Sequence, residues 1–100
     1  MDLLIKRDDI RSAVLNSSAP LSVADGEIIV EVARFSFTAN NVSYAVAGES
    51  AGLEYFKFYP HNEDLSVGRI PVWGLGIVAV SRCPGVAVGE KLYGYFTMSR

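Results

Sequence analysis

The run PVWGLGIVAV, residues 71–80, places two glycines and an alanine in the G-x-G-x-x-A spacing of a dinucleotide-binding turn: Gly74, Gly76 and Ala79. Such a turn needs a helix directly after the glycines, because the helix N-terminus faces the pyrophosphate. The residues after Gly76 are mostly β-branched and Pro84 stops the run, so no helix of about ten residues fits there. We therefore interpret these glycines as positions where a strand bends or where another backbone segment comes close.

Turn residues divide the rest of the chain into short segments of extended character, which predicts a strand-rich fold. In the segment EIIVEVARFSFT, apolar residues lie first on one face and then on the other, which predicts a bend or a bulge. A Pro-Gly pair at residues 84–85 predicts a tight turn between the last two strands. The predicted extended segments are 2–7, 12–16, 27–38, 70–82 and 90–98.

One short helix is predicted between the strands, in the segment ANNVSYAVAG. Asn40 or Asn41 can cap it, and Gly48 can end it. The following segment, 49–69, is too polar and irregular for a core position but carries four aromatic residues, as lids and packing flaps do. Strands with one short helix favour a small β-barrel over a doubly wound sheet.

Length and composition exclude several classes of protein. A chain of 100 residues, half of them hydrophobic, can bury one core, so residues 1–100 are predicted to form a single domain. The formal net charge is −2 and no Lys/Arg cluster appears, which disfavours a nucleic-acid partner. Apolar stretches fall well short of the roughly 20 residues that cross a bilayer, and the N-terminus does not resemble a signal peptide. We therefore expect a cytoplasmic protein with no membrane partner.

Four segments taken in order, GEIIVEV, TANNVSYAVAG, IPVWGLGIVAV and GVAVGEKLYGY, resemble the N-terminal domain of the medium-chain dehydrogenase/reductase superfamily. The resemblance covers residues 25–96 and implies a mainly β fold: a GroES-like, partly open β-barrel with one or two short helices. The chain resembles an uncharacterised bacterial branch, domain of unknown function 2855, more closely still. The segments that carry this resemblance are RFSFTANNVSYAVAG, IPVWG and GVAVGEKLYGYF.

The chain departs from the zinc alcohol dehydrogenases of that superfamily at two ligand positions. Their Cys at the start of the short helix is replaced by Asn40 or Asn41, and the His and Glu of G-H-E are replaced by Leu75 and Gly76. Leucine cannot coordinate a metal, so no metal site is expected. The single Cys83 likewise excludes a multi-cysteine zinc site within these residues.

Without these zinc ligands, the chain is similar to the zinc-free quinone and enoyl reductases, in which the barrel forms one wall of the substrate cleft. The resemblance implies NADP or NAD as cofactor, bound mainly by a separate Rossmann domain. Because that domain is not among these residues, we expect the N-terminal fragment of a longer two-domain chain. Its Rossmann domain is then its main partner, and a homodimer is a further assembly to consider.

Candidate site residues follow from the same resemblance, each beside a structural alternative. Asn40 and Asn41 match an Asn that contacts substrate or the nicotinamide ribose, or they cap the helix. Tyr44 and Tyr55 are candidate catalytic proton donors, or packing tyrosines. Trp73 is a candidate wall of the substrate site, or fills the barrel or a domain interface.

Three further residues complete the set of candidates. Phe56, from the aromatic segment, is a second candidate substrate-binding residue. His61 is expected to be a solvated surface histidine and not a metal ligand. Cys83 lies beside Pro84 at the predicted turn and is not expected to act as a nucleophile.

Two classes of function remain open from the sequence. In the first, the chain is the substrate-side domain of a zinc-independent NAD(P)H-dependent quinone, enoyl or carbonyl reductase. In the second, it is a non-catalytic GroES-like barrel that serves as a binding or assembly module, as the same fold does in co-chaperonins. A reductase fold that has lost its chemistry is a third reading, since Ser43 stands where the relatives have Asp.

Overall fold

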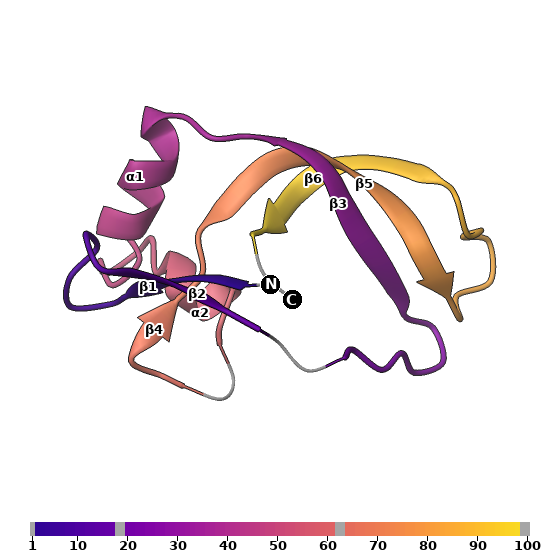
Figure 1. Cartoon of the computed structure of the whole chain (residues 1–100), viewed down its shortest axis with the longest axis horizontal. Helices are drawn as coiled ribbons and strands as arrows, with labels where there is room; N and C mark the ends of the chain where they lie inside the picture. Colours follow the sequence, from indigo (N-terminus) through magenta and orange to yellow (C-terminus); the bar gives the residue numbers. More distant parts are fainter. Residues whose placement is uncertain (1, 18–19, 62–63, 99–100) are drawn as a thin grey trace.

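The computed structural model describes residues 2–17, 20–61 and 64–98 (Figure 1). Over these residues the chain forms two antiparallel three-stranded sheets and two short helices, which confirms the prediction of a mainly β fold. The first sheet has the order β2-β1-β4 and the second the order β3-β5-β6. The strands are β1 (Asp2–Lys6), β2 (Ala13–Asn16), β3 (Ile28–Ser36), β4 (Val67–Gly68), β5 (Pro71–Ser81) and β6 (Lys91–Thr97), and the helices are α1 (Ala39–Val46) and α2 (Tyr55–Phe58).

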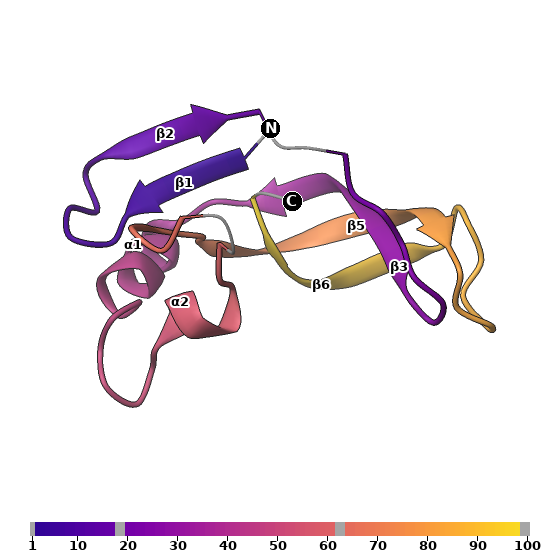
Figure 2. The ribbon, with the colours of Figure 1, turned by 90° about the horizontal axis from the view of Figure 1, so that it is seen from below.

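The two sheets lie at opposite ends of the molecule and meet in its middle. Figures 1 and 2 show the β3-β5-β6 sheet as a long twisted layer. The β1–β2 hairpin and both helices lie together at the end of this layer that is away from the β5–β6 turn. The backbone N–H of Leu3 in β1 donates to the carbonyl of Met98, directly after β6, at 3.0 Å. This bond joins the first strand of the chain to the end of the last.

The bend or bulge predicted for residues 27–38 is confirmed in β3. The pairing of β3 with β5 shifts register twice, between Ile29 and Val30 and again between Val32 and Arg34. Each shift inserts an irregularity that increases local twist. The apolar pattern changes face because the strand itself is irregular there.

Gly74 and Gly76 lie inside β5, an uninterrupted strand of 11 residues, which confirms the strand interpretation of the glycine motif. A Cβ atom added at Gly74 would lie 2.5 Å from the backbone oxygen of Arg34. A Cβ at Gly76 would come closer than 3.0 Å to the Val30 side chain. Both glycines therefore let β3 approach β5 at its irregular positions.

The predicted tight turn at residues 84–85 is also confirmed. The N–H of Val86 donates to the carbonyl of Cys83 at 3.2 Å, and Gly85 has φ of 87°. A positive φ at the third residue of a four-residue turn needs glycine, and proline suits the position before it. The turn opens the connection between β5 and β6.

The segment 49–69 is more structured than its polarity predicts, and the expectation that it stays outside the core is wrong in part. It contains α2 and β4, and Phe56 is only 2% exposed. The Phe56 ring lies between Gly48 and Gly68, where a Cβ atom on either glycine would come closer than 3.0 Å to ring carbons. His61, expected to be solvated, is also buried.

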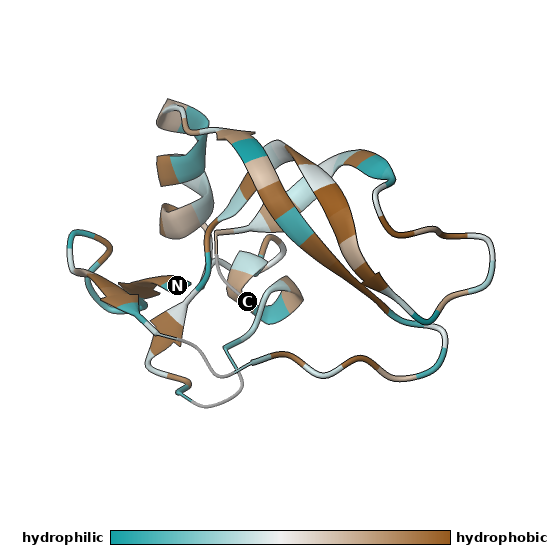
Figure 3. Cartoon of the chain, turned by 45° about the vertical axis from the view of Figure 1, so that its right-hand side comes forward, coloured by the Kyte–Doolittle hydropathy of each residue, from teal (hydrophilic) through white to brown (hydrophobic). Residues whose placement is uncertain are grey.

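The core is small and sits where the two sheets meet. Ile5, Ala45 and Ile70 form one buried cluster, and Val72 and Val78 are buried along β5. The opposite face of β5 is apolar as well but exposed. Figure 3 shows that hydrophobic positions recur along the strands of the long sheet. Among the residues described, no helix is both long and apolar enough to span a bilayer.

Candidate functional site

A pocket of about 300 Å³ opens where the end of β3 leads into α1, beside the start of β5. Ligand pockets concentrate at such junctions, where loops leave a rigid sheet. The described residues that line it are all uncharged, and they come from the β3–α1 connection, α1, β5 and β6. They are Ser36, Thr38, Asn40, Asn41, Tyr44, Trp73 and Tyr93.

The polar floor of the pocket is the first turn of α1. The Asn41 side chain is 3% exposed; its Oδ1 accepts the Thr38 N–H at 2.6 Å, and its Nδ2 donates to the Pro71 carbonyl at 2.9 Å. Thr38 is the N-cap residue, and Asn41 is the third residue of the helix and forms a capping box with Thr38. The prediction that Asn40 or Asn41 is the N-cap residue is therefore wrong, because both lie inside the helix. Asn41 thereby fixes α1 to β5.

Asn40 differs from its neighbour in both exposure and bonding. Its side chain is exposed, it lines the pocket, and no described residue hydrogen-bonds it. An amide of this kind can donate to or accept from a bound molecule. Of the two candidate asparagines, Asn40 is therefore the one whose carboxamide is available.

Aromatic rings form the wall of the pocket and continue behind it. Trp73 lies 4.7 Å from Tyr95 and 5.6 Å from Tyr93, measured between ring centroids, and the Trp73 and Tyr93 planes differ by 16°. Tyr44 lies 4.9 Å from Tyr55 and 5.6 Å from Tyr95. All five tyrosines of the chain and its one tryptophan belong to this aromatic cluster: Tyr44, Tyr55, Tyr59, Trp73, Tyr93 and Tyr95.

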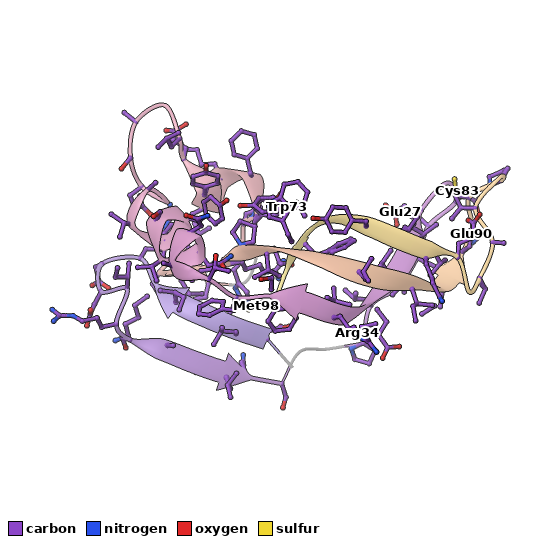
Figure 4. All side chains as sticks on the ribbon, turned by 90° about the horizontal axis from the view of Figure 1, so that it is seen from above. Glu27, Arg34, Trp73, Cys83, Glu90 and Met98 are labelled. Carbon is purple, nitrogen blue, oxygen red and sulfur yellow. The ribbon has the colours of Figure 1, made fainter. Side chains whose placement is uncertain are left out.

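The aromatic cluster lies at one end of the β3-β5-β6 sheet. Figure 4 shows Trp73 at the end of this sheet nearest the helices, whereas Cys83 and Glu90 lie at the opposite end. The pairing of Trp73 with Tyr95 and of Leu75 with Tyr93 places these side chains on one face of the sheet. The strand register therefore assembles the wall.

Burial raises the pKa of the Tyr95 hydroxyl above its ordinary value, and a hydrogen bond with Tyr44 acts in the same direction. A bond that favours the protonated form is one in which Tyr95 donates and the Tyr44 oxygen accepts. Burial raises the pKa of Tyr59 as well. The Tyr95 hydroxyl is thereby linked to Tyr44, which lines the pocket.

The structure brings together four of the six predicted site residues, namely Asn40, Asn41, Tyr44 and Trp73. Tyr55 contacts Tyr44 but does not line the pocket. Phe56 lies elsewhere, buried between its two glycines with the Arg7 guanidinium 5.5 Å from its ring centre.

Sequence reasoning missed Tyr93 and Tyr95. The signal was the alternation in LYGYF, since residues two apart in a strand share a face. Ser36 and Thr38 were missed too, because nothing in the sequence indicates that the β3–α1 connection faces a pocket.

Two other candidate groups lie outside the pocket. The Nδ1 atom of buried His61 accepts the Asp64 N–H at 3.0 Å. The free thiol of Cys83 has its sulfur 3.6 Å from the Pro84 carbonyl oxygen. In the described part of the chain, no three His, Cys, Asp or Glu side chains gather as a metal-ligand group.

The fold and the site define a small, mainly β domain with an uncharged, aromatic-walled pocket at the end of a three-stranded sheet. The chain belongs to the family described as Protein of unknown function (DUF2855), whose model matches residues 35–100. The matched range contains every residue named above as lining the pocket. No curated protein and no solved structure matches the chain.

Proposed function

We propose that the chain is the substrate-side domain of a zinc-independent, NAD(P)H-dependent reductase of the medium-chain dehydrogenase/reductase type, acting on a quinone, enoyl or carbonyl compound. The observation that carries this proposal is the pocket itself. It unites Asn40, Tyr44 and Trp73, which come from two of the four segments that resemble that superfamily. The bond from Leu3 to Met98, which joins the ends of the two sheets, supports a partly open barrel of the GroES-like type.

The phenol of Tyr44 is suited to the proton transfer that such a reduction needs. When hydride reaches a conjugated or carbonyl carbon, the negative charge that develops on the substrate must be neutralised by a proton. Tyr44 lines the pocket, and its hydroxyl is hydrogen-bonded to that of Tyr95, which would hold it in position. Tyr55 supports this arrangement by packing against the Tyr44 ring.

The cofactor would meet this chain only at one end. The pocket is about 300 Å³ and its described lining carries no Arg or Lys for a pyrophosphate, so these residues fit a ring and not a whole dinucleotide. Asn40 would contact the nicotinamide or its ribose, and Asn41 would hold the helix that presents Asn40. A bound NADP or NAD would supply the hydride, and a separate Rossmann domain would bind its phosphates.

A second function has one observation in its favour. Leu75 and Ile77 are exposed beside Trp73 along the outer face of β5, and such apolar patches often mark contacts with other proteins. A non-catalytic GroES-like barrel that serves as a binding or assembly module would use this face.

The deciding experiment is titration of the full-length gene product with NADPH and NADH, following nucleotide fluorescence and thermal shift together. Saturable binding with a rise in melting temperature is expected. A substrate screen would follow, with Tyr44→Phe expected to lower turnover by about a hundredfold. Failure of both nucleotides to bind would overturn the reductase proposal and leave the binding module.

A further inference from the structure

The chemistry of the pocket lining restricts what it can bind. None of the described lining residues carries a charge, and the polar groups of their side chains are hydroxyls, carboxamides and the indole N–H of Trp73. An anion placed there would lose hydration without gaining a cationic partner, which is unfavourable. The lining therefore selects against carboxylates and phosphates.

The wall of the pocket offers a flat apolar surface. Trp73 is 50% exposed and Tyr93 72% exposed, although both are large aromatic residues. Their centroids are 5.6 Å apart and their planes differ by only 16°, so the two rings stack on each other with an offset, and a flat ligand can extend this stack on an outer ring face. We call this pair the Trp73–Tyr93 shelf. Flat conjugated rings stack on such surfaces in offset arrangements.

The polar groups of the pocket lie at the end of β3 and the start of α1, where Ser36 is the direct cross-strand partner of Trp73. Asn41 is engaged by Thr38 and Pro71, so the exposed Asn40 carboxamide and the Ser36 hydroxyl provide the free hydrogen-bonding groups. Both are neutral. The volume of about 300 Å³ is at the lower end of the range for ligand pockets, which suits one ring or two fused rings.

We propose that this pocket binds an uncharged, planar, conjugated ring compound bearing a carbonyl, stacked on the Trp73–Tyr93 shelf, with Tyr93 as a specificity-determining residue. The compound is the substrate only if the proposed reductase function holds, but its binding does not depend on the cofactor. The ring lies on the shelf, and its carbonyl accepts a hydrogen bond from Asn40 or Tyr44.

Isothermal titration of the full-length gene product with a matched pair of probes tests this proposal. Coumarin is uncharged, flat and carries a carbonyl, whereas coumarin-3-carboxylate has the same rings and a negative charge. We expect coumarin to bind at least tenfold more tightly than its carboxylate. A third probe, methyl β-glucopyranoside, is neutral but not planar, and is expected not to bind. Equal or tighter binding of the carboxylate or the glucoside would overturn the proposal.

Variants locate the binding. Tyr93→Ala is expected to weaken coumarin about fivefold because it removes half of the shelf, and Tyr93→Phe to retain binding because it keeps the ring. Phe58→Ala is the matched control, since Phe58 is 74% exposed but does not line the pocket, and it should leave the affinity within twofold. No effect of Tyr93→Ala, or an equal effect of Phe58→Ala, would refute the site.

The two proposals fail in different ways. Loss of NADPH and NADH binding with retained coumarin binding would refute the reductase function alone. Absence of coumarin binding in a protein that binds NADPH would refute the ligand class alone.

Discussion

The Tyr95 ring on β6 stands edge-on to the Tyr44 ring on α1, with centroids 5.6 Å apart and an angle of 88° between their planes. Edge-to-face packing at this distance is favourable because the positive edge of one ring meets the negative face of the other. The contact joins the last strand to the first helix, and the two tyrosines lie 51 positions apart in the chain. It also links the pocket residue Tyr44 to a phenol whose pKa is raised by burial.

The raised pKa of Tyr95 makes stability depend on pH in the alkaline range. The pKa is higher in the folded protein than the ordinary value of 10.0, so folding favours the neutral phenol. This contribution to the free energy of unfolding is complete below about pH 10 and is lost as the pH rises from there through the folded-state pKa. Urea unfolding between pH 8 and pH 11 should therefore show a smaller loss of stability in Tyr95→Phe than in the unmodified protein.

The control for that experiment is Tyr93→Phe, which removes the hydroxyl of a mostly exposed tyrosine on the same strand. Its stability should fall with pH as steeply as that of the unmodified protein. If Tyr95→Phe also fell as steeply, the buried phenol would not be the group responsible.

Asn40 and Asn41 form a matched pair for separating structural from binding roles. Asn41→Ala should lower the free energy of unfolding by about 1–3 kcal/mol, because it leaves the Pro71 carbonyl and the Thr38 N–H without their partner. Asn40→Ala should change it by less than about 0.5 kcal/mol, since that side chain is exposed. Chemical unfolding followed by circular dichroism measures both, and equal losses would contradict the assigned hydrogen bonds.

Phe56 is held between two glycines, and adding a methyl group to either should destabilise the protein. Gly68→Ala is expected to cost about 1–3 kcal/mol because its Cβ would overlap the ring. Replacing the ring by a smaller side chain should relieve the overlap, so Gly68→Ala with Phe56→Leu should cost less than the two single changes added together. Strict additivity in a double-mutant cycle would show that the ring does not fill this space.

Much of the fold could be predicted from local signals in the sequence. The alternation of apolar residues gave the strands 27–38 and 70–82 within a few residues of β3 and β5. The Pro84–Gly85 pair fixed the turn, because its backbone requirement is local. Even the bend in β3 could be predicted, since a change of face in the apolar pattern needs a change in register.

What could not be predicted depends on contacts between distant segments. The side chain of Asn41 donates to the carbonyl of Pro71, 30 residues away. Because this contact is not visible in the local sequence, the sequence did not show that Thr38, and not Asn40 or Asn41, is the N-cap residue. α2 has only four residues and follows Glu54 in a left-handed conformation, which no local pattern signals. Its burial comes from the close approach of two glycines to Phe56.

The candidate site could also be predicted only where its residues lie in segments with a local sequence pattern. Tyr44 and Trp73 were found because they lie in segments with a recognisable pattern. Tyr93 and Tyr95 belong to the aromatic cluster only through the register that pairs Trp73 with Tyr95. That register is set jointly by the β5–β6 turn and by pairing along both strands, so it could not be predicted from the single motif.

Alanine substitutions at the two glycines of the G-x-G motif should respond differently to a second substitution at Val30, because the glycines face different atoms. At Gly74 the nearest atom is the backbone oxygen of Arg34, which cannot move without disturbing the strand pairing; at Gly76 it is the side chain of Val30. Both Gly74→Ala and Gly76→Ala should lower the free energy of unfolding by about 1–3 kcal/mol. Val30→Ala should relieve the Gly76→Ala clash and should leave the Gly74→Ala defect unchanged. Thermal unfolding of the single and double variants measures this difference.

Since the motif lies within a strand, any of these variants that folds should bind NADPH as the unmodified protein does. A selective loss of nucleotide binding in folded Gly74→Ala would contradict the structural role of the motif.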